Sequence, residues 1–187
     1  RSMGQKPLFV IWPDAGDFGL DAALEARGYP VVDPVVGYTA PIAEIAQMEA
    51  SNTYPQWPPL AITRQVWAQA GIGPARLAVM ARAAGPKTAI LVRQGDHPAG
   101  VCFVAMAGDH AMIHALEVLP DYRRGGLAQK LIVRAAHWAG GQSARYLSLV
   151  VTRANAPARA LYTRMGMGEA GQYHYREAPS LLQNGQV

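Results

Sequence analysis

The chain has 187 residues, of which 50% are hydrophobic, so it can bury one sizeable core or one domain with a fragment of another. No apolar run approaches the roughly 18 residues of a membrane span, and the first residues lack the pattern of a secretory signal. The net charge of +4 is dispersed along the chain, which argues against a nucleic-acid or membrane partner but suits a ligand with several phosphates. The single cysteine, Cys102, excludes an internal disulfide and indicates a cytoplasmic protein.

The first half of the chain predicts mostly short helices after two strands. Strands are expected at residues 7–12 and 30–40, the second interrupted by Pro34, with a helix over 19–29 that Gly28 ends. A helix is expected over 41–50 and a loop over 51–60, because the loop contains three prolines. Two further helices are expected over 61–71 and 73–85.

From Lys87 onward the pattern changes to short strands separated by turn residues. Residues 87–95, 99–108 and 110–120 predict an antiparallel meander with tight turns at Gly95 and Gly108. A helix beginning near Leu127, a strand over 145–153, a helix over 156–166 and a final strand over 170–178 follow. This order predicts an α/β protein with a mixed sheet.

The stretch Arg123-Arg124-Gly125-Gly126 lies at the expected start of a helix. A helix N-terminus has unpaired N–H groups and a partial positive charge, and the glycines with Ala128 leave room for an anion. The two arginines add charge for further phosphate groups, so the stretch fits a pyrophosphate. A tight turn in which the glycines serve only backbone geometry is the alternative.

Two motifs in order resemble the GNAT superfamily of N-acetyltransferases: Val118-x-Pro120-x-x-Arg123-x-x-Gly126-x-Ala128, and the segment from Asn155 to Met167. The resemblance covers about Val35 to Arg176. It implies a mostly antiparallel central sheet that splays at an acyl-CoA cleft, with helices on both faces, and acetyl-CoA as co-substrate. The cofactor-binding residues that it implies are Leu116, Val118, Arg123, Arg124, Gly125, Gly126, Leu127, Ala128 and Asn155.

The resemblance also predicts two units. Residues 1–38 resemble the closing strand-helix-strand segment of a preceding, degenerate GNAT-like half, as in tandem members of the superfamily. Residues 39–187 would form the acetyltransferase domain. The similarity between residues 20–29 and 158–167 is a weak sign of such a repeat.

Tyr162 is the expected catalytic acid, because the resemblance places it near the sulfur and a phenol can protonate a leaving thiolate. His114 is the first candidate for the base and Glu117 the second. Simple alternation along a strand would put these two side chains on opposite faces. A histidine that only fills the sheet face, with water as the base, is an equal alternative for His114. His110 and His114 lie on a strand with no third ligand, so no metal is expected.

The acceptor is expected to be a small-molecule or peptide primary amine, which attacks the thioester directly in a ternary complex. The segments 51–60 and 172–176 supply an aromatic lining for it, namely Tyr54, Trp57, Tyr173, His174 and Tyr175. The alternative function is a non-catalytic acyl-CoA sensor or regulatory protein. A homodimer is compatible with either function.

Overall fold

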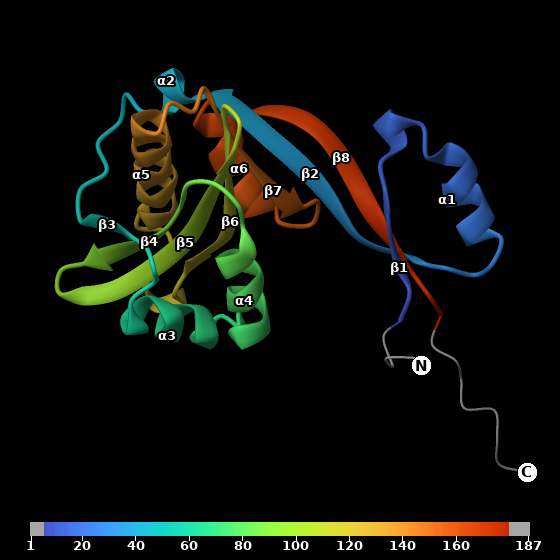
Figure 1. Cartoon of the computed structure of the whole chain (residues 1–187), viewed down its shortest axis with the longest axis horizontal. Coiled ribbons are helices and arrows are strands. Elements are labelled where there is room, and N and C mark those ends of the chain that lie inside the picture. The colour runs from blue at the N-terminus through green and yellow to red at the C-terminus, as the bar shows by residue number, and fades with distance from the viewer. Residues whose placement is uncertain (1–5, 180–187) are drawn as a thin grey trace, which may run out of the picture.

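The computed structural model describes residues 6–179 and contains one eight-stranded sheet with the order β1-β8-β2-β7-β6-β5-β4-β3 (Figure 1). Its neighbouring strands are antiparallel except for β6 and β7. The strands are β1 (Leu8–Ile11), β2 (Val31–Pro41), β3 (Thr53–Gln56), β4 (Lys87–Gln94), β5 (His97–Ala107), β6 (His110–Val118), β7 (Tyr146–Thr152) and β8 (Gly168–Glu177). The α-helices are α1 (Phe18–Glu25), α2 (Ile42–Ile45), α3 (Ala61–Gln69), α4 (Pro74–Arg82), α5 (Leu127–Gly141) and α6 (Ala156–Arg164), with 3-10 turns at Pro13–Ala15 and Pro120–Tyr122.

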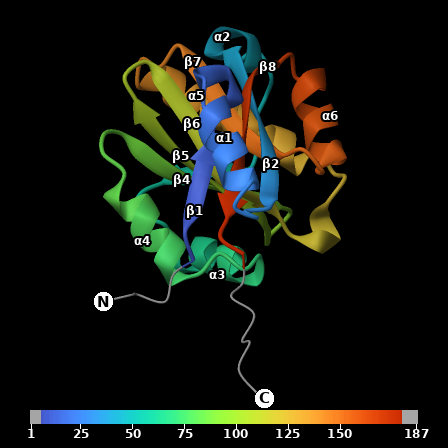
Figure 2. The same ribbon diagram turned by 90° about the vertical axis from the view of Figure 1, so that its right-hand side faces the viewer.

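Helices cover both faces of the sheet, as the sequence predicts (Figure 2). Helices α2, α5 and α6 pack on one face, where Ile90, Val104 and Leu147 join the larger core. Helices α3 and α4 pack on the other face against Leu91 and Phe103. The central strands β4 and β5 are therefore buried on both sides, which explains why they read as nearly continuous apolar runs.

The sequence predictions for residues 41–60 were wrong in two places. Residues 53–56 form the edge strand β3, in which Pro55 lies opposite Ile90 of β4. Proline has no N–H to donate, but an edge strand has one side without a partner, so the proline is tolerated there. The helix expected over 41–50 is the single turn α2, Ile42–Ile45.

An arm projects from the body of the molecule (Figure 1). It consists of the N-terminal elements β1, α1 and the first part of β2, together with the last part of β8. Strands β1 and β2 both pair with β8. The pairing of β2 with β8 shifts register between Val32 and Val35, next to Asp33 with its φ of 45°. Since β2 runs unbroken past residue 38, the division into units 1–38 and 39–187 stays a prediction; residues 1–5 and 180–187 of those ranges lie outside the described part.

Charged residues fasten α1 to β8. Asp21 of α1 accepts hydrogen bonds from Arg176 Nε (2.7 Å) and His174 Nε2 (3.0 Å). Arg176 is 5% exposed and also donates to the carbonyl oxygen of Tyr29 (2.9 Å). The bond from Arg176 is the largest influence on the Asp21 carboxyl and lowers its pKa.

We expect Asp21→Asn to lower the free energy of unfolding by about 1–3 kcal/mol, because a nearly buried guanidinium loses its charged acceptor. The lowered pKa of Asp21 means that the native state favours its carboxylate form. The stabilisation from Asp21 is therefore fully present above the ordinary carboxyl pKa, and it is lost as the pH falls through the lowered pKa. Urea unfolding at several pH values measures both effects. Asp14→Asn, an exposed change in the same arm, serves as the control; equal stability of the two variants would contradict the prediction.

Candidate functional site

The sheet opens between β6 and β7. These parallel strands pair only from His110 and Tyr146 to Ile113 and Leu149. Beyond that point β6 stays paired with β5, whereas β7 stays paired with β2, so the two strands diverge. A cavity of about 890 Å³ lies at the opening, lined by residues of β6, the following loop, α5 and α6.

The loop after β6 leads directly into the N-terminus of α5. Gly126 is the N-cap residue and has a φ of 76°, a conformation that glycine adopts without strain. No side chain caps this helix end, so its first N–H groups are available to an anion at the cavity. Arg123 Nε donates to the carbonyl oxygen of Val118 (3.1 Å), which closes the loop.

Eight of the nine predicted cofactor-binding residues line this cavity: Leu116, Val118, Arg123, Arg124, Gly126, Leu127, Ala128 and Asn155. Gly125 is not among the lining residues. A Cβ at this position would point to the Tyr122 carbonyl oxygen and the Gln94 side chain, at 3.6 and 3.7 Å. Tyr122, Gln129, Leu161 and Arg164 also line the cavity, and none of them was predicted as a site residue, although Leu161 and Arg164 lie within the second motif.

Tyr162 projects from α6 into the same cavity. Its helix begins after Asn155, whose Oδ1 accepts a hydrogen bond from the N–H of Ala158 (3.2 Å). Burial, then the negative charge of Glu117, raise the pKa of Tyr162 to about 12. The phenol therefore stays protonated near neutral pH and can serve as a proton donor.

A bulge in β6 corrects the predicted faces of His114 and Glu117. Ala115 has a φ of 49°, and the register with β5 shifts so that His114 lies opposite Phe103 and Glu117 opposite Val101. Opposite residues of an antiparallel pair share a face, and Val101 and Phe103 are two apart, so His114 and Glu117 lie on the same face. The expectation of opposite faces was wrong because regular alternation does not count the extra residue.

Glu117, the second candidate for the base, lines the cavity together with Tyr162, whereas His114 does not. Burial raises the pKa of the Glu117 carboxyl, and the charge of Arg123 opposes this shift. Burial and the nearby charge of Arg76 lower the pKa of His114. The ring of His114 packs against Phe103 with 6.4 Å between centroids, which agrees with a residue that fills the sheet face.

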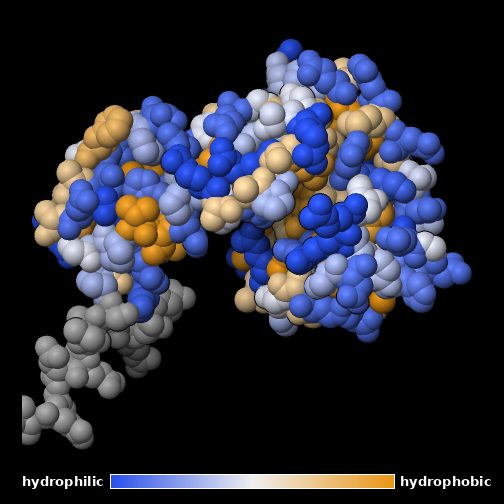
Figure 3. Space-filling view, turned by 180° about the vertical axis from the view of Figure 1, so that it is seen from behind, coloured by the Kyte–Doolittle hydropathy of each residue, from blue (hydrophilic) through white to orange (hydrophobic). Residues whose placement is uncertain are grey.

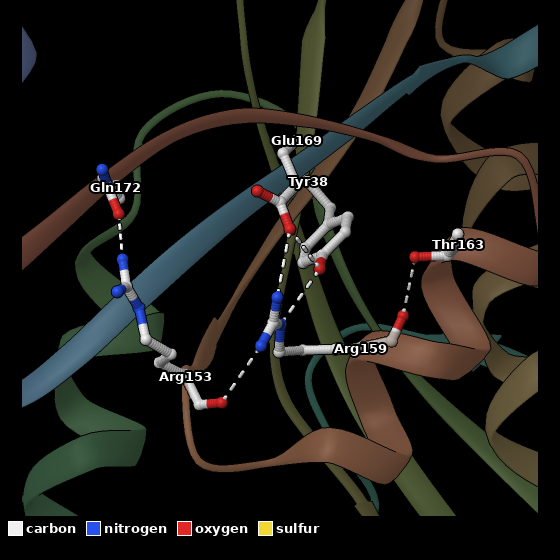
Figure 4. A network of polar contacts seen from close by, with 6 residues as sticks. All are labelled: Tyr38, Arg153, Arg159, Thr163, Glu169 and Gln172. Carbon is white, nitrogen blue, oxygen red and sulfur yellow. Dashed lines mark hydrogen bonds and ion pairs between the residues drawn. The ribbon is translucent and has the colours of Figure 1, made fainter.

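A polar network surrounds the hydroxyl of Tyr38 (Figure 4). The ring of Tyr38 on β2 meets Tyr162 edge-on, with 5.5 Å between centroids. The Tyr38 hydroxyl donates to Glu169 Oε1 (3.0 Å) and accepts from Arg159 Nε (3.3 Å), and Arg159 also pairs with Glu169 (3.3 Å). Tyr38 is 2% exposed and is held by these hydrogen bonds, so its ring forms a fixed wall beside the Tyr162 ring.

The aromatic residues expected around the acceptor do not form one lining. Tyr54 is exposed on the edge strand β3, and Trp57 packs against Phe103. His174 forms a hydrogen bond with Asp21. Tyr173 does line a second, smaller pocket, together with Trp12 of the arm. Tyr175 contacts Tyr173 ring to edge at 5.5 Å but does not line that pocket.

Within residues 6–179, no three histidine, cysteine, aspartate or glutamate side chains are grouped so that they could hold a metal ion. In the same part of the chain, no helix has the length and apolar composition that crossing a membrane requires.

A sheet that splays beside an uncapped helix N-terminus is the arrangement that the resemblance to the GNAT superfamily predicts, and comparison with known proteins agrees. The family model described as "Acetyltransferase (GNAT) family" matches residues 42–167 of the chain. The chain therefore belongs to the GNAT family of acetyltransferases.

Individual relatives resemble the chain over different lengths. A Bacillus subtilis protein named as a candidate ribosomal protein bS18-alanine N-acetyltransferase is 33% identical over 82 residues, which are 44% of this chain and 54% of that protein. The match thus spans about half the length of this curated relative. A GCN5-related N-acetyltransferase from Kribbella flavida has a TM-score of 0.66 at 16% identity, over 92% of this chain and 68% of its own. The ribosomal-protein-S18-alanine N-acetyltransferase from Escherichia coli has a TM-score of 0.53 at 19% identity, over 72% of this chain and 99% of its own.

Proposed function

We propose that this chain transfers the acetyl group of acetyl-CoA to a primary amine by direct attack in a ternary complex. The observation that carries the proposal is that one cavity brings together Glu117, Tyr162 and the uncapped N-terminus of α5. A carboxylate can accept the proton of the amine, a protonated phenol can supply one to the leaving sulfur, and an anion site can hold the pyrophosphate of CoA.

The residues around the α5 N-terminus fit a pyrophosphate. Gly126 and Ala128 keep the wall small, the first N–H groups of α5 are uncapped, and Arg124 adds positive charge. Asn155, which caps α6, lies where it can also contact the pantetheine arm. Acetyl-CoA supplies the activated acyl group when bound.

In the proposed reaction the amine nitrogen attacks the thioester carbonyl carbon, so that a C–N bond forms and the C–S bond breaks. Glu117 removes a proton from the nitrogen, and Tyr162 donates one to the departing sulfur. Proton exchange with solvent then restores both side chains. Backbone N–H groups of Leu116 to Val118, where β6 has lost its parallel partner, are proposed to hold the carbonyl oxygen during attack.

The acceptor is proposed to be a primary amine that includes peptide α-amines. Two of the similar proteins are named for acetylation of the alanine of ribosomal protein S18, which supports a peptide N-terminus as one candidate. The buried thiol Cys102 supports the proposal that the reaction takes place in the reducing cytoplasm. A homodimer stays a prediction.

A thermal-shift series tests the binding step of this proposal. We expect acetyl-CoA and CoA to raise Tm, because only the folded state forms the cavity, and ATP and NAD to have little effect. Ala128→Phe, which fills the wall beside the helix N-terminus, should abolish the shift. Ala75→Phe on the exposed side of α4 is the matched control and should keep it.

An acetyl-transfer assay with amines and short peptides then tests the chemistry. Release of free CoA that depends on the amine supports the enzyme. Saturable acetyl-CoA binding without transfer to any amine would instead indicate the non-catalytic acyl-CoA sensor. Equal stabilisation by ATP or NAD would contradict both functions.

A further inference from the structure

A second hollow, of about 150 Å³, lies where the arm meets the body. Trp12 and Tyr173 of the arm form one wall, and Met112 and Val150 of the central strands form another. Figure 3 shows the arm separated from the body by a deep notch. The pocket therefore depends on the N-terminal arm, which lies outside the residues matched by the family description.

A glycine pair shapes the pocket. Gly37 of β2 lies opposite Gly171 of β8, and a Cβ on Gly37 would meet the carbonyl oxygen of Gly171 at 3.5 Å. Gly171 has a φ of 151°, a conformation that residues with side chains rarely adopt. Both glycines line the pocket, and neither adds a side chain to it.

The walls of the pocket are aromatic and uncharged. The rings of Trp12 and Tyr173 pack against each other with 4.5 Å between centroids. Trp12 is 45% exposed, so its ring is stabilised on one side only and can contact a ligand on the other. No side chain that lines the pocket carries a charge, since the lining besides Trp12 and Tyr173 consists of tyrosine, methionine, serine, leucine, valine, alanine and two glycines.

The pocket adjoins the proposed reaction site through two contacts. Tyr38 lines the pocket, and its ring packs at 5.5 Å against Tyr162, which lines the larger cavity. Met112 and Leu149, which also line the pocket, lie where the pairing of β6 with β7 ends and the strands diverge. The pocket thus borders the point where β6 and β7 diverge, although it shares no lining residue with the larger cavity.

We propose that this pocket, between Trp12, Tyr173 and the Gly37–Gly171 pair, binds the apolar side chain of the acceptor amine. This inference rests on the proposed function and specifies its substrate: an amine whose neighbouring carbon carries an uncharged aliphatic or aromatic group. An apolar cavity of roughly this volume holds a molecule the size of benzene, so a leucine or phenylalanine side chain fits. In this proposal the amine itself is directed toward Glu117, which lines the larger cavity with Tyr162.

Leucinamide and asparaginamide test the inference, because their side chains have similar shapes but differ in polarity. We expect kcat/KM for leucinamide to exceed that for asparaginamide at least tenfold, because the pocket cannot satisfy the buried amide of asparagine. Trp12→Ala should lower kcat/KM for leucinamide about tenfold, mainly through KM, and leave KM for acetyl-CoA unchanged. Phe18→Ala, which removes a 68% exposed aromatic ring from the same arm but not from the pocket, is the matched control and should have no effect.

Calorimetric binding of leucinamide to the CoA-saturated protein separates this inference from the proposed function. Binding that Trp12→Ala weakens and Phe18→Ala does not would support the pocket even without turnover, in which case the proposed catalysis fails instead. Equal use of the two amides, or equal kinetics of wild type and Trp12→Ala, would overturn the inference while the acetyl transfer stands. Failure of leucinamide both to bind and to react would also overturn it.

Discussion

Glu117→Gln is expected to lower kcat for acetyl transfer by about 100- to 10,000-fold, the range that a positioned general base contributes. Glutamine keeps the shape of the side chain but cannot accept the proton of the attacking amine. Because Glu117 lies on β6 and the proposed pyrophosphate site is the N-terminus of α5, the thermal shift with CoA should be retained. Steady-state kinetics with a saturating amine and acetyl-CoA measure the loss.

The pH profile gives this prediction a second, independent readout. Burial raises the pKa of Glu117, and the base must be deprotonated, so the rate falls as the pH drops through this raised value. The acidic limb of the wild-type profile should therefore lie above the ordinary carboxyl value of 4.5 and should be absent from the residual rate of Glu117→Gln.

His114→Gln is the matched control, since His114 lies on the same strand face but outside the cavity. We expect at most a small change in kcat for this variant. If instead His114→Gln lost the activity and Glu117→Gln kept it, the base would be His114, and the proposed role of Glu117 would be contradicted.

Regular patterns in the sequence predicted most of the body of the fold. The meander β4 to β6 follows from short apolar runs separated by Gly95 and Gly108, both of which adopt positive φ. The start of α5 at Leu127 follows from the glycines before it and the apolar residues after it. These elements were predictable because their local preferences and their burial favour the same structure.

Features that depend on partners distant in the sequence were not predictable. Residues 51–60 contain three prolines, which predict a loop, but residues 53–56 form the strand β3 because they pair with the free edge of β4. The bulge at Ala115 leaves no mark in the sequence, because alanine has no preference for positive φ, yet it brings Glu117 to the same strand face as His114. Trp12 and Tyr173 are 161 residues apart in the numbering and meet only through the pairing of β1 with β8.

Tyr162→Phe is expected to lower kcat by about 100- to 10,000-fold while acetyl-CoA still binds. The phenol hydroxyl is lost, so the departing sulfur must take its proton from water, but the ring contact with Tyr38 is kept. Since the pKa of Tyr162 is raised to about 12, the wild-type acid stays protonated across the usual assay range, and a basic limb from its ionisation should appear only near that value.

Tyr38→Phe is the control that separates proton donation from positioning. It removes the hydrogen bonds to Glu169 and Arg159 but keeps the edge-on ring beside Tyr162, so we expect a much smaller loss of kcat. The two variants should therefore differ in rate although each lacks one buried phenol hydroxyl. Equal losses would show that the polar network, rather than the Tyr162 hydroxyl, limits the reaction. Wild-type turnover by Tyr162→Phe would mean that water protonates the sulfur, which the position of this phenol in the cavity argues against.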